Sequence, residues 1–131
     1  MGANLLSWGA KKQATVSRFM IEAEYRALAS TTAELMCFMN LLKSIGYCLP
    51  PPKLCCDNIS VIIMAKNPVF HHHTKHIEID VHFVRERVAS GALLLEHVVG
   101  TAQLTDILTK PLCSDKFVSN HAKLLIGSQP P

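Results

Sequence analysis

No stretch of this chain stays apolar for long enough to cross a membrane. A spanning helix needs about 18 or more consecutive apolar residues, and none of the hydrophobic runs reaches that length. Residues 1–15 also lack the apolar core of a secretory signal peptide. We therefore expect a soluble intracellular protein, cytoplasmic or nuclear, that has no membrane partner.

The chain also has little net charge and no cysteine pattern typical of a disulfide or zinc protein. The net formal charge is only +3, which permits contact with phosphates without predicting it. Five cysteines, an odd number with no C-x-x-C pair, argue against a disulfide framework and a zinc knuckle, so we expect reduced thiols packed as small apolar groups. There is no internal repeat or low-complexity tract. The length of 131 residues and 49% hydrophobic content predict one globular domain over residues 1–131, with a frayed tail at 127–131.

One long helix over residues 17–46 is the organising element that the sequence predicts. Ser17 is its candidate N-cap, and apolar residues recur at intervals of three and four. The stripe consists of Tyr25, Leu28, Ala29, Leu35, Met36, Met39 and Leu42. Glu24 lies at the edge of this stripe, where a carboxylate is either a solvated helix residue or a functional acid.

An α/β order follows the long helix. Residues 53–56 predict a short buried strand, residues 59–66 and 77–90 two helices, and residues 92–99 a second strand, which together suggest a parallel pair joined by a crossover. Gly91 is the expected C-cap residue of the second of these helices. We also expect a short strand at residues 5–8 with an extended segment after it, a turn at 100–103, and helices at 104–110 and 117–126.

Two aspartates stand where strands end. Asp57 follows the first buried strand, a place where α/β sheets put ligand-binding groups, although Asp57 or Asn58 could equally be the cap of the next helix. Asp106 occupies a similar place after the second strand. Together with Glu24, these acids offer hard oxygen ligands for Mg²⁺. Two such ions can activate a water and stabilise the leaving oxygen in the hydrolysis of a phosphodiester. Two ions usually use a fourth acid, and the other candidates, Glu22, Glu78, Asp80 and Asp115, are not on predicted strands.

Four histidines between residues 71 and 76 also invite a metal interpretation. No cysteine or carboxylate stands at ligand spacing among them, so a polar loop that enters a helix is the alternative we favour.

Several separated motifs resemble the ribonuclease H domain that ends the Pol polyprotein of copia-type LTR retrotransposons. They are Ser7-Trp8, Lys11-Lys12-Gln13, Glu22-Ala23-Glu24-Tyr25-Arg26-Ala27-Leu28, Cys56-Asp57-Asn58, Asn67-Pro68, Thr74-Lys75-His76-Ile77, His82-Phe83-Val84-Arg85-Glu86 and Asp106-Ile107-Leu108-Thr109-Lys110-Pro111-Leu112. The resemblance covers residues 3–126, and the order of the motifs makes it specific.

The resemblance implies a ribonuclease H-like α/β fold that cuts the RNA strand of an RNA:DNA hybrid with two Mg²⁺ or Mn²⁺ ions. It makes Glu24, Asp57 and Asp106 the catalytic and metal-binding acids, with Asp80 a weaker candidate for the last role. The candidate contacts to the hybrid or another nucleic acid are Lys11, Lys12, Asn58, Lys75 and His76.

The family pattern also has two strands before Ser7-Trp8, the first of which carries a further Asp, and this sequence contains neither. We therefore expect an incomplete mixed sheet flanked by helices, weak or absent catalysis, and self-association through an open sheet edge. Two alternatives remain: a non-catalytic nucleic-acid-binding or protein-interaction module, and an enzyme completed in trans by another copy or chain.

Overall fold

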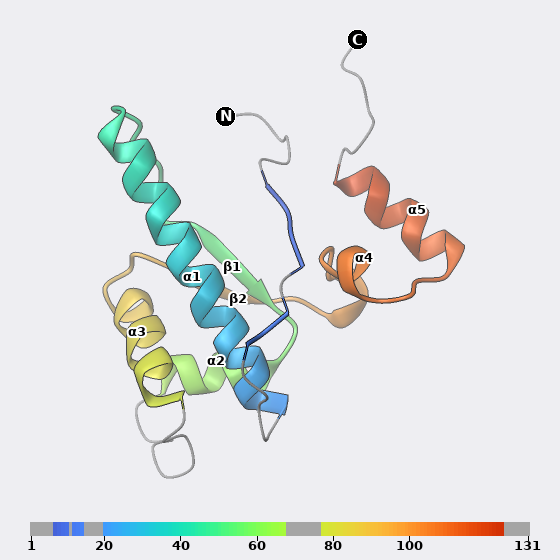
Figure 1. Ribbon diagram of the computed structural model, residues 1–131, viewed down its shortest axis with the longest axis horizontal. Helices are drawn as coiled ribbons and strands as arrows, with labels where there is room; N and C mark the ends of the chain where they lie inside the picture. Colours follow the sequence, from blue (N-terminus) through green and yellow to red (C-terminus); the bar gives the residue numbers. More distant parts are fainter. Residues whose placement is uncertain (1–6, 11, 15–19, 68–76, 125–131) are drawn as a thin grey trace. The chain divides into compact units, whose positions relative to one another are not determined.

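A computed structural model describes residues 7–10, 12–14, 20–67 and 77–124 of the protein. The elements in chain order are α1 (Met20–Ser44), β1 (Lys53–Cys56), α2 (Ile59–Lys66), α3 (Glu78–Ala89), β2 (Leu94–His97), the 3-10 turn η2 (Gly100–Ala102), α4 (Asp106–Thr109) and α5 (Ser114–Lys123) (Figure 1). The protein is a mixed α/β chain with a small parallel sheet.

The elements fall into two compact units. The central unit is Ala14–Val98, which holds α1 to α3 and both strands. The terminal unit combines Met1–Gln13 with Val99–Pro131 and holds η2, α4 and α5. The single domain expected from the sequence stays a prediction. Within the described ranges, no helix combines the length and apolar character needed to cross a bilayer.

Helix α1 forms where the apolar stripe predicts it. Tyr25, Leu28, Ala29 and Leu42 of the stripe are buried, whereas Leu35, Met36 and Met39 are half-buried. The chain leaves the helix through Gly46, whose φ of 87° is a backbone conformation that favours glycine. The expected N-cap Ser17 lies outside the described residues.

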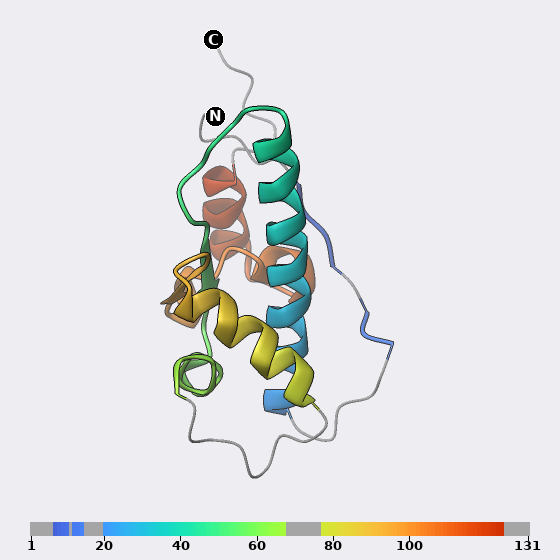
Figure 2. The ribbon, with the colours of Figure 1, turned by 90° about the vertical axis from the view of Figure 1, so that its left-hand side faces the viewer.

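The core of the central unit forms between the helices and one face of the sheet. Helices α1 and α2 both pack against α3, which runs obliquely across α1 (Figure 2). The core cluster consists of Tyr25, Leu28, Ala29, Val61, Ile62, Met64, Ala65, Ile77, Val81, Val84 and Leu95. The cluster includes Val81 and Val84 of the helix expected within residues 77–90, and Gly91, with φ of 73°, follows that helix as expected.

The sheet confirms the predicted crossover. β1 and β2 pair in parallel, with Leu54 opposite Leu95, and α2 and α3 form the connection between the two strands. Leu54, Cys56 and Leu95 face the core, while the other face carries an exposed ion pair between Lys53 and Glu96 at 3.3 Å. In the part of the chain that is described, each strand has a single neighbour, so the expected self-association through a sheet edge stays a prediction.

Other expectations need correction. The sheet of the described residues is parallel rather than mixed. Of the strand expected at residues 5–8, residues 7 and 8 lie in no strand, and residues 5 and 6 lie outside the described residues. β2 is shorter than 92–99 and α4 shorter than 104–110, since the chain enters α4 through i to i+3 turns at Leu104 and Thr105. Helix α5 starts at Ser114, three residues before its predicted start. The five cysteines are free, but all except Cys56 are exposed rather than packed.

Candidate metal and nucleic-acid site

A hydrogen bond joins the helix carboxylate to the end of the first strand. Asn58 Nδ2 donates to Glu24 Oε2, across 34 residues of sequence. The other end of the same amide, Oδ1, accepts from the backbone N–H groups of Ser60 and Val61 at 2.9 and 3.4 Å. Asn58 is therefore the N-cap of α2 and also fixes the position of Glu24, so the cap interpretation is correct for Asn58.

Asp57 lies immediately before this amide, at the carboxyl end of β1. Its side chain is exposed and makes no hydrogen bond or ion pair with any residue that the structure describes. Glu24 is half-buried. The strand end thus presents one exposed carboxylate and one partly shielded carboxylate.

The Cys56 thiol is within the electrostatic influence of both acids. Its pKa is raised, first by burial and then by the negative charges of Asp57 and Glu24, while a hydrogen bond with the Asn58 backbone lowers it. The two sulfur contacts to Asn58 are 3.4 Å from the backbone nitrogen and 3.7 Å to the carbonyl oxygen. Glu24 is held by Asn58, the residue that follows Asp57, so both carboxylates stand at the same end of β1.

The donor set at this site fits a hydrated Mg²⁺ ion. Mg²⁺ prefers oxygen ligands, keeps several waters, and is commonly bound through one or two carboxylates plus substrate phosphate. Asp57 is accessible, and the Oε1 atom of Glu24 is not used by Asn58. Among the described residues there is no group of three or more histidines, cysteines or acids that could hold a metal.

Asp106 belongs to the terminal unit and has a different environment. It is 5% exposed, and its two oxygens contact Lys110 Nζ at 2.8 Å and Lys116 Nζ at 3.4 Å. The pKa of Asp106 is lowered, and the hydrogen bond from Lys110 is the largest cause. Burial raises this pKa, while the charge of Lys110 and the hydrogen bond and charge of Lys116 lower it further. A metal ion at Asp106 would have to displace at least one ammonium group.

The remaining predicted site residues are only partly described. Lys12 is exposed, whereas Lys11, Lys75 and His76 lie outside the described residues, as do the other histidines of the 71–76 segment. Asn58 uses both ends of its amide within the protein, so a nucleic-acid contact from it stays a prediction.

Sequence reasoning did not identify three features of these sites. The bridge from Asn58 to Glu24 has no local signal. Lys110 has a local signal, because it follows Asp106 by four residues, a spacing at which ion pairs form on helices. Lys116 has no such signal. Glu22, considered only as a spare acid, is 5% exposed, and its Oε1 has no hydrogen-bond partner among the described residues.

Comparison with known proteins finds relatives among transposon polyproteins. The chain is 43% identical over 132 aligned positions, 100% of its length, to the retrovirus-related Pol polyprotein from transposon RE1 of Arabidopsis thaliana. Identity to the corresponding protein of transposon RE2 of the same plant is also 43% over the whole chain. The Pol polyprotein of transposon TNT 1-94 of Nicotiana tabacum is 32% identical over 93% of the chain.

The homologues of this chain are therefore retrovirus-related Pol polyproteins of plant transposons. It spans only 9% of the length of each of these relatives. No family model and no solved structure matches the chain.

Proposed function

We propose that this chain is a ribonuclease H-like segment of a copia-type retrotransposon Pol polyprotein. In this proposal Glu24 and Asp57 hold Mg²⁺ or Mn²⁺ against the RNA strand of an RNA:DNA hybrid. The single observation that carries it is the contact of Asn58 with Glu24, because this contact brings a helix carboxylate to the strand end that bears Asp57. Homology along the whole chain to Pol polyproteins supports the same assignment.

The residues have distinct roles in this proposal. Asp57, exposed and without a described side-chain partner, is the group that a hydrated ion and the hybrid can approach directly. Glu24, fixed through Asn58, offers its remaining oxygen from the helix side. Glu24 and Asp57 would hold the divalent ions, which would supply activation of a water and stabilisation of the leaving oxygen of the phosphodiester. Fixing Glu24 before the metal arrives reduces the reorganisation that binding requires.

Catalysis by the 131-residue chain alone is expected to be weak. Two-metal sites usually use four acids, and the central unit offers two of them, Glu24 and Asp57. Asp106 of the terminal unit is held by Lys110 and Lys116, and its role as a metal ligand stays a prediction. The absence of one ligand should cost several kcal/mol of transition-state stabilisation.

The experiment is cleavage of a labelled RNA:DNA hybrid in Mg²⁺ or Mn²⁺ over a series of protein concentrations. We expect slow cleavage that requires the divalent ion and disappears in Asp57→Asn. Glu34→Gln is the matched control, because Glu34 is an exposed acid of the same helix as Glu24. Specific activity that rises with protein concentration would mean that a second copy supplies the missing ligand.

Two results would refute this assignment. Cleavage that persists unchanged in Asp57→Asn would place the chemistry elsewhere. Hybrid binding that ignores both the divalent ion and Asp57 would leave the alternative of a non-catalytic binding module.

A further inference from the structure

Helix α5 exposes its apolar side chains and buries a polar one. Phe117 is 47% exposed and Val118 is 65% exposed, whereas Asn120 of the same helix is 1% exposed. A surface helix ordinarily packs its apolar side chains inward and keeps its polar side chains in water. The outward aromatic side chain of α5 therefore needs an explanation other than packing.

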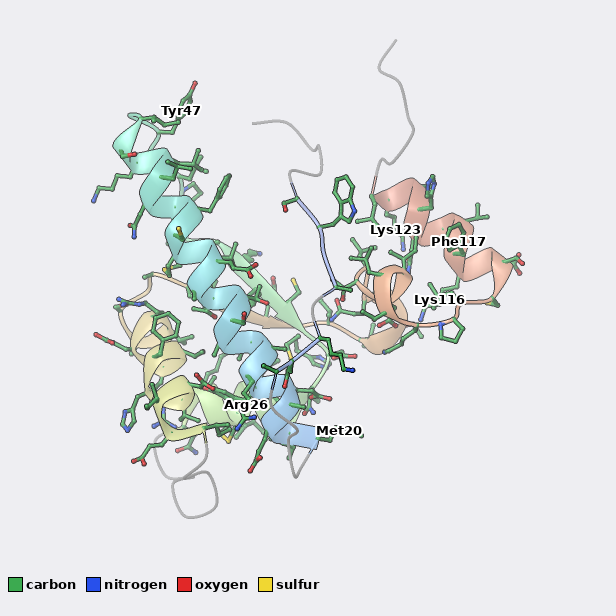
Figure 3. The ribbon with its side chains drawn as sticks, viewed as in Figure 1. Met20, Arg26, Tyr47, Lys116, Phe117 and Lys123 are labelled. Carbon is green, nitrogen blue, oxygen red and sulfur yellow. The ribbon has the colours of Figure 1, made fainter. Side chains whose placement is uncertain are left out.

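Phe117 is part of an ordered aromatic pair. His121 follows it by one helical turn, and the two rings stack with centroids 5.9 Å apart and planes inclined by 23°. Lys123 is exposed and follows His121 by two residues, and Lys116 directly precedes Phe117 (Figure 3). Because the Lys116 ammonium group contacts Asp106 at 3.4 Å, the exposed Lys123 is the cation that this helix presents to solvent after the ring stack.

The charge of the chain is concentrated in the same unit. Of the thirteen basic and ten acidic side chains, the terminal unit contains five lysines and two aspartates, which gives it the whole net charge of +3. The eight basic and eight acidic side chains of the central unit cancel. A positively charged unit with an exposed phenylalanine stacked on a half-buried histidine has the two components that bind unpaired nucleotides: a ring face for the bases and cations for the phosphates.

We propose that Phe117 and His121 form a stacking platform for unpaired bases of single-stranded nucleic acid, with Lys123 contacting the phosphate backbone. Stacking requires bases that are not already paired, so the ligand is a single strand rather than the duplex region of a hybrid. The contact uses the π face that every base carries, so it tolerates both DNA and RNA. This site requires neither Glu24, Asp57 nor a metal ion.

The test is fluorescence anisotropy of the full chain with labelled oligo(dT), oligo(U) and a blunt duplex, all in EDTA. Phe117→Ala should weaken single-strand binding by at least about fivefold, the lower end of what one stacked base contributes. Val118→Ala, a more exposed apolar side chain of the same helix, is the matched control and should bind like the wild type. Lys123→Gln should reduce the slope of log affinity against log salt by about 0.7, as expected for one lost phosphate contact to a single strand.

Phe117→Trp separates stacking from folding, because it restores a larger ring at the same position. It should bind at least as tightly as the wild type, and His121→Ala should weaken binding in the same direction as Phe117→Ala. The proposal is wrong if Phe117→Ala binds single strands like the wild type, if Phe117→Trp binds them as weakly as Phe117→Ala, or if duplex binds as tightly as single strand. A difference between oligo(dT) and oligo(U) would identify which strand the platform prefers. Because EDTA removes the divalent ion, failure here would leave the proposed metal site untouched.

Discussion

Asn58 fixes the position of Glu24 by donating its side-chain amide to the Glu24 carboxylate, while the carbonyl of the same amide caps α2. One side chain thus ties the long helix α1 to the junction between β1 and α2. This junction also carries Asp57, so the residue that stabilises the local fold also arranges the two acids.

Replacing Asn58 should therefore lower stability through two separable interactions. Asn58→Ser keeps a side-chain oxygen for the cap but loses the amide donor, and it should cost about 1 kcal/mol. Asn58→Ala loses the cap as well and should cost about 2 kcal/mol in total. Urea denaturation followed by circular dichroism measures both. Equal stability of the Ala variant and the wild type would show that the bridge and the cap contribute nothing.

Tyr25 should make the protein sensitive to alkali. Its side chain is fully buried, and burial raises its pKa from 10.0 to about 12, with Arg85 opposing and Asp80 adding to the rise. The folded state retains the proton that the unfolded state loses, so the stabilising contribution is complete below a pH of about 10 and is lost as the pH rises towards about 12.

Tyr25→Phe should remove this part of the alkaline loss. At neutral pH it should not destabilise, because the Tyr25 hydroxyl is buried with no hydrogen-bond partner among the described residues. Tyr47→Phe is the control, since Tyr47 is 59% exposed. Urea midpoints near neutrality and near pH 11 decide the matter, and an alkaline loss in Tyr25→Phe as large as in the wild type would contradict the assignment.

The Cys56 thiol should report on metal binding at the carboxylate pair. Burial and the charges of Asp57 and Glu24 raise its pKa, so a cation bound between those acids should lower that pKa and increase the thiolate fraction. Alkylation of Cys56, followed by mass spectrometry, should therefore become faster when Mg²⁺ is added at constant ionic strength. The exposed neighbour Cys55 is the internal control. If Mg²⁺ accelerates both thiols equally, or neither, the ion does not bind at this pair.

The two lysines at Asp106 should be mutually replaceable, but their joint loss should not be tolerated. Lys110→Met or Lys116→Met alone should cost less than about 1 kcal/mol, because each lysine is partly exposed and the other remains. The double variant leaves a carboxylate that is 5% exposed without either partner and should cost about 3 kcal/mol.

Adding Asp106→Asn to the double variant should restore most of the lost stability, because the unpaired charge is then gone. If Asp106 is also a metal ligand, Mn²⁺ should raise the melting temperature of the double variant more than that of the wild type. An unchanged melting temperature in Mn²⁺ would restrict Asp106 to its role in holding α4 against α5.

Elements with local signals could be predicted from the sequence. The bounds of β1 and α2 agree with the prediction, because the Pro50-Pro51-Pro52 run, the Asn58 cap and Asn67-Pro68 mark them within a few residues. The apolar stripe of α1 could also be predicted, because its spacing of three and four residues is a local signal. Helix α5 was predicted to start too late, since its N-cap Cys113 makes no capping hydrogen bond and offered no cap signal.

Pairings between distant residues could not be predicted. Nothing near Glu24 indicates that Asn58 will bind it, because the contact exists only once α1 has packed beside the β1–α2 junction. Lys116 reaches Asp106 only through the packing of α4 and α5. The sequence therefore indicated which acids to consider, whereas tertiary packing decides which of them are accessible and which are neutralised.

Hybrid binding tests whether Glu24 and Asp57 hold a divalent ion against an RNA:DNA hybrid. The measurement is the affinity of the chain for a labelled hybrid, with and without Mg²⁺ at constant ionic strength, for the wild type, the Glu24→Gln/Asp57→Asn double variant and the Glu34→Gln control. We expect Mg²⁺ to tighten binding by the wild type and the control, and the double variant to lose this gain. An equal effect of Mg²⁺ on all three proteins, or none on the wild type, would contradict this expectation.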